Sequence, residues 1–287
     1  TSDEHYTKAE YREYQKRMLE YGVEVVTEID TPAHSACFSK AVPQYMFDGH
    51  HIDITNPDAV GFICNLWDEY ITGDDPVFVS KTVHFGTDEF PDGYNEQMRA
   101  FTDTLIKHLR SRGCTPRFWG SFGGKGFNGE TPVSGDAQTN FWAVELSDYK
   151  TLFKMGYDVI NTCGPVLYCV PGGNYGFANY YDLRSLYSTW FVNYMGYNAS
   201  TSVKYDHPQL KGASFALWND LWCDWGGFSI FDIFDRLRYQ ICLISEKTWC
   251  GEQTREISAD DFISRFDILS TKSGGSNPGR HEALPID

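Results

Sequence analysis

Two adjacent carboxylates, Asp88 and Glu89, follow a short apolar run at residues 81–85 (KTVHF). The run predicts a strand, and Pro91 predicts that a loop follows it. On a solvated surface such a pair would do nothing, but loops at strand ends are where α/β enzymes keep their chemistry. Acid and nucleophile on opposite faces of one ring come from different strands, about 5 Å apart. Adjacent carboxylates must work from the same side, so one would act as a general acid while the other steadies a group of the substrate.

Apolar runs alternate with amphipathic segments along the whole chain, and these are the elements that must position the pair. The predicted strands cover residues 22–30, 81–85, 115–121, 138–143, 157–162 and 212–219. The predicted helices cover residues 6–21, 56–71, 94–112, 147–155 and 230–245, with one more in the aromatic loop after residue 162. This succession of six βα units predicts an α/β fold with parallel strands joined by crossover helices.

Such alternation is typical of either an open doubly wound sheet or a closed eight-fold barrel. A Gly-rich dinucleotide loop after the first strand would favour the open sheet, but the turn at residues 31–34 reads TPAH. In five of the six strands the residues with chemical character lie at the carboxyl end, which fits the mouth of a barrel. They are Asp30 with His34, Asp88 with Glu89, Trp119, Trp142, and the segment 218–220. We therefore predict a (β/α)8 TIM-barrel-type fold, with six βα units readable in this chain.

The bulk composition fits one large catalytic domain. The chain has 287 residues, of which 41% are hydrophobic and 22% are charged, and this is enough for one sizeable core. The segment 272–287 is rich in Gly, Ser and Pro and is typical of a linker. We predict a barrel domain over residues 1–255, followed by a terminal helix and a Gly/Ser/Pro-rich tail over residues 256–287.

The charge balance limits the partners. With 24 Lys and Arg against 39 Asp and Glu, the formal net charge is -15. Nucleic acid and anionic membrane are not expected partners, because phosphate binding needs clustered basic residues. Aromatic residues make up 16% of the chain, and flat rings with a polar edge suit sugar recognition as well as ordinary cores. No run of about 18 apolar residues occurs, so no membrane span is expected, and the polar start TSDE does not resemble a signal peptide.

The cysteine pattern indicates neither zinc nor redox chemistry. The eight cysteines are spread out without a CxxC pair, and most lie in apolar stretches, as small buried side chains do. The spacing of His and carboxylate residues suggests no metal site. We expect neither a metal nor a cofactor, and the oligomeric state is left open.

Three motifs carry a resemblance to a known family. Residues 84–89 (HFGTDE) resemble the H-x-G-G/T-D-E signature of glycoside hydrolase family 20, the β-N-acetylhexosaminidases and lacto-N-biosidases. Residues 28–34 (EIDTPAH) are similar to that family's E-I/F-D-x-P-G/A-H turn, and residues 217–220 (LWND) to its W-x-E/D element. The three motifs occur in the family's order, each after the expected strand. The resemblance covers residues 6–252.

The resemblance implies roles for individual residues. Glu89 would protonate the glycosidic oxygen and later deprotonate water, while Asp88 would hold the N–H of an acetamido group whose oxygen attacks the anomeric carbon. Tyr168 matches the tyrosine that hydrogen-bonds this acetamido oxygen, with Tyr175 as the alternative position. The implied substrate-binding residues are Trp119 and Trp142 around the acetyl methyl, Trp218 under the sugar ring, Asp220 at ring hydroxyls, and His34 with Asp30 behind the acid. Aromatic neighbours would also desolvate Glu89 and raise its pKa toward neutral.

Some features argue for other interpretations. Trp119 and Trp142 could be ordinary core residues, and His34 could be a turn histidine. The chain starts at what resembles the helix before the family's third barrel strand, so we expect two strands to be absent, and with them an arginine that clamps sugar hydroxyls. Asp220 replaces the glutamate of the W-x-E element, and Val170 stands where many members have an aspartate.

The resemblance implies a retaining glycoside hydrolase that acts by substrate-assisted catalysis on terminal β-linked N-acetylhexosamine, an exo-β-N-acetylhexosaminidase. One alternative is a lacto-N-biosidase releasing Gal-β1,3-GlcNAc, which the TPAHS turn, the HFGTDE variant and Asp220 resemble. A second alternative, from a different class, is an inactive carbohydrate-binding fragment. The expected partner is a glycan ending in β-linked GlcNAc, GalNAc or lacto-N-biose. The expected location is secreted or on the surface of a bacterial cell.

Overall fold

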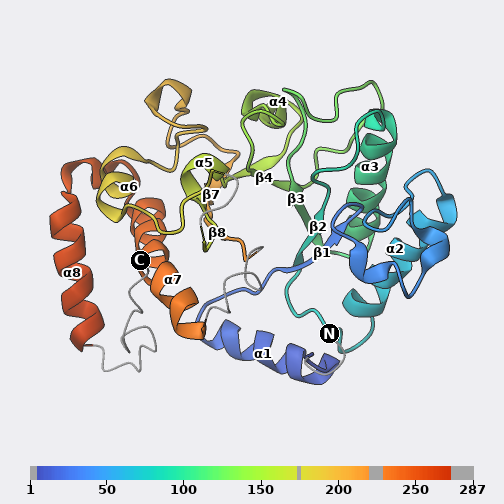
Figure 1. Ribbon diagram of the computed structural model, residues 1–287, viewed down its shortest axis with the longest axis horizontal. Helices are drawn as coiled ribbons and strands as arrows, with labels where there is room; N and C mark the ends of the chain where they lie inside the picture. Colours follow the sequence, from blue (N-terminus) through green and yellow to red (C-terminus); the bar gives the residue numbers. More distant parts are fainter. Residues whose placement is uncertain (1–4, 173–175, 220–228, 273–287) are drawn as a thin grey trace. The chain divides into compact units, whose positions relative to one another are not determined.

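The computed structural model describes residues 5–172, 176–219 and 229–272. The chain divides into two compact units. Figure 1 labels their helices and strands. The first unit comprises Thr1–Asn140 and Glu145–Asp158, and the second comprises Phe141–Val144 and Val159–Asp287.

The first unit alternates helices with parallel strands, as the sequence predicts. The strands lie in the order β1-β2-β3-β4, and each neighbouring pair is parallel. The elements are α1 (Lys8–Glu20), β1 (Thr27–Thr31), the short 3-10 helices η1 (Ala36–Phe38) and η2 (Pro43–Tyr45), α2 (Pro57–Ile71), β2 (Thr82–Gly86), α3 (Asn95–Ser111), β3 (Thr115–Trp119), β4 (Gln138–Phe141, of which the last residue belongs to the second unit) and α4 (Tyr149–Lys154).

Sequence patterns explain the helices of this unit. Thr7 and Glu10 form a capping box at the start of α1, in which each side chain bonds the other's backbone N–H. The Asn56 side chain accepts the Asp58 N–H at the start of α2, where Pro57 occupies the first turn. Helix α3 buries one face, whose positions recur at spacings of three and four residues, and it packs against β3 and α2.

Strand β2 lies in the core of this unit. All five of its residues are buried, and β1 and β3 pair with it on its two sides. The Phe85 ring lies 5.4 Å from the Phe118 ring, which in turn lies 5.1 Å from the Tyr157 ring in an edge-on contact. A strand fixed on both edges and both faces gives a rigid base for the residues that follow its carboxyl end.

The second unit contains two further parallel ladders. Strand β5 pairs with β7, and β6 pairs with β8. The elements are β5 (Asp158–Asn161, of which the first residue belongs to the first unit), α5 (Gly164–Leu167), β6 (Tyr168–Cys169), α6 (Leu183–Thr189), η3 (Ala199–Thr201), β7 (Leu210–Ala213), β8 (Ala216–Leu217), α7 (Ile230–Cys250), η4 (Gly251–Glu256) and α8 (Ala259–Lys272). Helix α6 packs against α7 and α8, and its Tyr187 ring stacks on Phe262 at 4.6 Å.

Several predicted elements differ from the observed ones. The aromatic loop after residue 162 holds two α-helices, α5 and α6, where the sequence predicts one. Only residues 27–31 of the predicted strand 22–30 are strand, because the ladder with β2 starts at Thr27. The predicted strand 212–219 is two strands, since β7 pairs with β5 while β8 pairs with β6. Helix α7 continues five residues beyond the predicted end at residue 245. Helix α8 lies in the segment for which the sequence predicts a terminal helix. The domain boundary at residue 255 stays a prediction. The tail from residue 273 lies outside the described residues.

Seven of the eight cysteines lie among the described residues, and all seven are free thiols. Three of them, Cys114, Cys163 and Cys169, are buried, whereas Cys37 in the η1 turn is exposed and departs from the predicted burial. In the described parts of the chain, the helices are too short or too polar to cross a membrane.

Candidate active site

The carboxyl ends of β1 and β2 meet. Thr31 lies opposite Gly86, and the Thr87 N–H donates to the Thr31 carbonyl at 2.9 Å. The turn after β1 and the carboxylate pair after β2 therefore lie beside one another. Glu28 pairs with His84 and Thr31 pairs with Gly86, so two residues of β1 lie between these pairs where β2 has one. Strand β1 therefore holds one extra residue, a β-bulge. Such a bulge bends a strand and re-aims its side chains, here those around Asp30.

The backbone here adopts uncommon conformations. Among the described residues, three that are not glycine have a positive φ, namely His34 at 52°, Thr87 at 79° and Glu89 at 50°. All three follow the ends of β1 and β2. Residues held in this region cost free energy and cluster at functional sites, so this local geometry points to function rather than to an ordinary turn.

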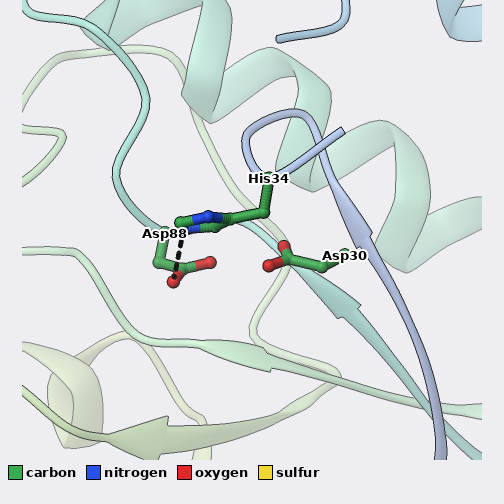
Figure 2. Close-up of side chains that lie close together, drawn as sticks. All are labelled: Asp30, His34 and Asp88. Atoms are coloured by element: carbon green, nitrogen blue, oxygen red, sulfur yellow. Dashed lines mark ion pairs between the residues drawn. The ribbon is translucent and has the colours of Figure 1, made fainter. Parts of the chain in front are cut away.

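His34 lies between the two carboxylates. Its Nε2 atom is 3.5 Å from an Asp88 oxygen, the contact that Figure 2 shows as a dashed line. The same atom is 3.3 Å from a Glu89 oxygen. Hydrogen bonding to Asp88 and Glu89 outweighs burial and raises the pKa of His34 to about 11. The hydrogen bond from His34, against partial burial, holds the pKa of Glu89 below its ordinary value. In the free chain at neutral pH, the shared proton therefore lies on the imidazole.

The low pKa of Glu89 corrects a prediction. The sequence predicts that aromatic neighbours desolvate Glu89 and raise its pKa, but its side chain is 54% exposed in this structure. At that exposure desolvation is a smaller effect than the hydrogen bond from His34, and this hydrogen bond decides the direction. The Trp119 indole N–H donates to Glu28.

Glu28 holds two rings on adjacent strands. The Trp119 N–H donates to a Glu28 oxygen at 2.7 Å, and His84 Nδ1 lies 3.0 Å from the same oxygen. The rings of His84 and Trp119 lie 4.9 Å apart. Burial disfavours the charged form of Glu28, but the contacts with His84 and Trp119 outweigh it and lower the pKa. The sequence motifs predict no role for Glu28 or His84, although these residues open EIDTPAH and HFGTDE.

Asp30 lies behind the ion pair. Asp30, His34 and Asp88 each bring one oxygen or nitrogen atom within 4.8 Å of the other two. Burial, with repulsion from Asp88 and Glu28, raises the pKa of Asp30 to about 9 in spite of the nearby His34. A metal ion at these three groups would have to displace the proton from His34, because only a neutral imidazole ligates. We therefore interpret these side chains as an ion-paired proton-transfer group.

The second unit gathers three other predicted residues. The Tyr168 and Trp218 rings meet edge to face at 5.6 Å, because their strands β6 and β8 are paired. The Gly164 N–H donates to the Trp142 carbonyl at 2.6 Å. A Cβ on Gly164 would lie 3.1 Å from that carbonyl and 3.2 Å from the Tyr168 ring, so glycine permits the close approach. Val170, two residues after Tyr168 in the sequence, is buried.

The amino-terminal 251 residues match one family model, described as glycosyl hydrolase family 20, catalytic domain. The match spans most of the 287-residue chain. The chain belongs to glycosyl hydrolase family 20.

Two curated proteins are similar to this family 20 chain. A lacto-N-biosidase from Bifidobacterium bifidum is 24% identical over 282 residues, which cover 85% of this chain and 23% of that protein. A beta-hexosaminidase from Vibrio furnissii is 31% identical over 102 residues, which cover 31% of this chain and 16% of that protein. The family 20 chain thus spans 23% or less of the length of these curated relatives.

Solved structures agree on the fold. A beta-N-acetylhexosaminidase from Bacteroides fragilis superposes with a TM-score of 0.74 at 20% identity, over 98% of this chain and 60% of that one. Dispersin B gives a TM-score of 0.68 at 18% identity, over 84% of this chain and 77% of that one. With the parallel βα alternation, these likenesses confirm the predicted TIM-barrel-type fold.

The described part of the family 20 domain holds eight of the nine predicted site residues. The first unit brings together Asp30, His34, Asp88, Glu89 and, through Glu28 and His84, Trp119. The second unit brings together Trp142, Tyr168 and Trp218. Asp220, the ninth residue, and Tyr175, the alternative to Tyr168, lie outside the described residues.

Proposed function

We propose that this domain is the catalytic part of a retaining glycoside hydrolase that removes a terminal β-linked N-acetylhexosamine by substrate-assisted catalysis. The observation that carries the proposal is the His34 contact with both Asp88 and Glu89 at the end of β2. The contact places a proton donor, His34, beside Glu89 and beside the Asp88 carboxylate. The match to family 20, and similarity to proteins named lacto-N-biosidase and beta-hexosaminidase, support the choice of substrate.

The proton for the leaving group belongs to the pair of His34 and Glu89. In the free chain it lies on His34, 3.3 Å from a Glu89 oxygen. A bound sugar excludes water from the half-exposed Glu89, and desolvation favours the neutral carboxyl group. The proton then crosses to Glu89, which donates it to the glycosidic oxygen as the bond to the anomeric carbon breaks.

Asp88 handles the charge that develops inside the substrate. As the acetamido oxygen bonds to the anomeric carbon, positive charge spreads toward the acetamido nitrogen, and the Asp88 carboxylate accepts its N–H and offsets that charge. Glu89, now ionised, takes a proton from the water that attacks the anomeric carbon. The bond between that carbon and the acetamido oxygen breaks, which restores the acetamido group. Two displacements at one carbon retain its configuration, which is the outcome expected of the product.

The family resemblance supports roles for the aromatic residues. Tyr168 would donate to the acetamido oxygen, and Trp119 and Trp142 would enclose the acetyl methyl. Trp218 would lie under the sugar ring, and Asp220 would accept from its hydroxyls. The hydrogen bond between Trp119 and Glu28 fixes one of these walls before substrate arrives, which favours a preformed pocket.

A second candidate is a lacto-N-biosidase. The observation in its favour is the match to the Bifidobacterium bifidum enzyme, which covers 85% of this chain against 31% for the beta-hexosaminidase. An inactive carbohydrate-binding fragment is the third possibility. A secreted or cell-surface location in a bacterium is in line with the bacterial relatives and stays a prediction.

The test compares aryl β-glycosides of GlcNAc, GalNAc and lacto-N-biose as substrates. Release of the single sugars supports the leading proposal, and release of the disaccharide alone supports the lacto-N-biosidase.

We expect Glu89→Gln and Asp88→Asn each to lower kcat by on the order of 100-fold or more. The exposed Asp92→Asn provides the matched control and should leave kcat unchanged. If Glu89→Gln kept turnover within a few-fold of the parent, Glu89 would not be the acid. Binding of GlcNAc without turnover of any substrate would favour the carbohydrate-binding fragment.

A further inference from the structure

Two partly buried carboxyl groups face one another beside His34. Figure 2 shows Asp30, from β1, and Asp88, from the segment after β2, with their carboxyl groups pointing toward each other. An oxygen of each lies within 4.8 Å of the other. The Oδ1 atoms of both are buried, and neither has a hydrogen-bond partner among the described residues. Buried carboxylate oxygens normally accept hydrogen bonds, so these two need an explanation.

The fold forces Asp30 into this position. Its Oδ1 atom occupies the space that a Cβ on Gly86 would take, and such a Cβ would also lie 2.7 Å from the Thr31 nitrogen. Gly86 has a φ of +80°, which glycine adopts without strain. The bulge in β1 and the glycine in β2 thus together admit a carboxyl group between the strands.

No basic side chain among the described residues forms an ion pair with Asp30, although His34 lies nearby. The acidic groups facing this space are Glu28, Asp30, Asp88 and Glu89, and the basic groups are His34 and His84. His34 contacts Asp88 and Glu89, and His84 contacts Glu28. Two partly buried carboxylates at this separation do not both ionise readily, because each repels the other's charge and water solvates neither of them fully.

We propose that Asp30 carries a proton and donates it to the buried Oδ1 of Asp88, and that this hydrogen bond holds Asp88 in the orientation that binds the acetamido N–H. Asp30 is then a positioning residue, and this role rests on the proposed function. The arrangement satisfies both orphaned Oδ1 atoms with one proton. The other Asp88 oxygen, Oδ2, faces His34 and stays available to the substrate.

The electrostatics of the site agree with this assignment. Burial, together with the charges of Asp88 and Glu28, raises the pKa of Asp30 to about 9, so the proton is present throughout the neutral range. Above that pH Asp30 ionises, the hydrogen bond becomes a repulsion, and Asp88 loses its fixed orientation.

Infrared spectroscopy tests the proton without requiring activity. At pH 7 solvated carboxyl groups are ionised, so a carbonyl-stretching band of a protonated carboxylic acid reports a buried one. We expect this band in the parent chain, its loss as pH rises through about 9, and its absence in Asp30→Asn. The exposed Asp92→Asn should keep the band. A parent chain without the band, or a band that persists in Asp30→Asn, would overturn the proposal.

Activity measurements test the positioning role. Asparagine keeps the shape of the side chain and a hydrogen-bond donor. Asp30→Asn should therefore retain kcat within about tenfold at pH 7 and extend the activity above pH 9. Asp30→Leu has no donor and should lose on the order of 100-fold in kcat. If both variants lost activity equally, with the same pH profile as the parent, Asp30 would be only a structural residue. A band without glycosidase activity would contradict the proposed function alone, and activity without a band would contradict the shared proton alone.

Discussion

His34 decides how protons are held at this site. Its imidazole contacts two carboxylates, and its pKa of about 11 means that the shared proton survives into the alkaline range. In His34→Gln that proton would have to be held by Glu89 alone, whose pKa would rise because burial is no longer opposed. Even so, a carboxyl group releases its proton at a lower pH than this ion pair does. We expect the alkaline limb of kcat/KM to move to lower pH and kcat to fall on the order of 10- to 100-fold.

The same substitution should change stability with a definite sign. The folded chain binds the His34 proton more tightly than the unfolded chain does, so the stabilisation is complete below about pH 6.5 and is lost as pH rises toward about 11. His34→Gln should therefore lower the unfolding temperature more at pH 6 than at pH 10. His5→Gln, in an exposed segment, is the control and should alter neither profile. An unchanged pH–rate profile in His34→Gln would show that His34 takes no part in holding the proton.

At the scale of elements, the junction of β1 and β2 depends on one glycine. Gly86→Ala would place a Cβ on top of the Asp30 carboxyl group, at a φ of +80°. Gly73→Ala is a matched control, because Gly73 has a φ of +93° and nothing within 4 Å of its Cβ position. The control should cost about 1 to 2 kcal/mol of unfolding free energy through the backbone alone. Gly86→Ala should cost more and also lower kcat, as measured by denaturant unfolding and by assay under folded conditions; equal costs would show that Asp30 moves aside freely.

The positions of most elements could be predicted from the sequence. The β2 run and the amphipathic pattern of α3 locate those elements within one residue at each end, because burial imposes a regular spacing on a strand or helix. The split between β7 and β8 could not be predicted, since residues 212–219 form one apolar run and the break depends on which strand each half pairs with. The late start of β1 has the same cause.

The candidate site was predictable by position but not by interaction. Asp88, Glu89 and His34 follow strand ends, and parallel strands bring such ends to one edge. The contact of Glu28 with His84 depends on the register of β1 against β2, which the sequence does not reveal. The lowered pKa of Glu89 depends on one side-chain contact with His34, so a composition argument about aromatic neighbours predicted the wrong direction.

At the scale of the whole molecule, the two units carry different parts of the predicted chemistry. The first unit holds the groups that gain and lose charge, Asp30, His34, Asp88 and Glu89. The second unit holds Trp142, Tyr168 and Trp218, which are suited to packing on an apolar sugar face and to one hydrogen bond. The match to the family model spans residues from both units.

The net charge of -15 makes a prediction about substrate choice. A negatively charged molecule repels an anionic ligand at long range, and this repulsion weakens as salt shortens the screening length from about 30 Å at 0.01 M to about 8 Å at 0.15 M. We expect kcat/KM for an aryl β-GlcNAc carrying a 6-sulfate to rise several-fold over that range of salt, while kcat/KM for the uncharged aryl β-GlcNAc stays constant. The uncharged substrate is the control for effects of salt on the enzyme itself. If both substrates responded alike, the field of the molecule would have no part in selection, and any preference for neutral sugars would have to come from contacts within the pocket.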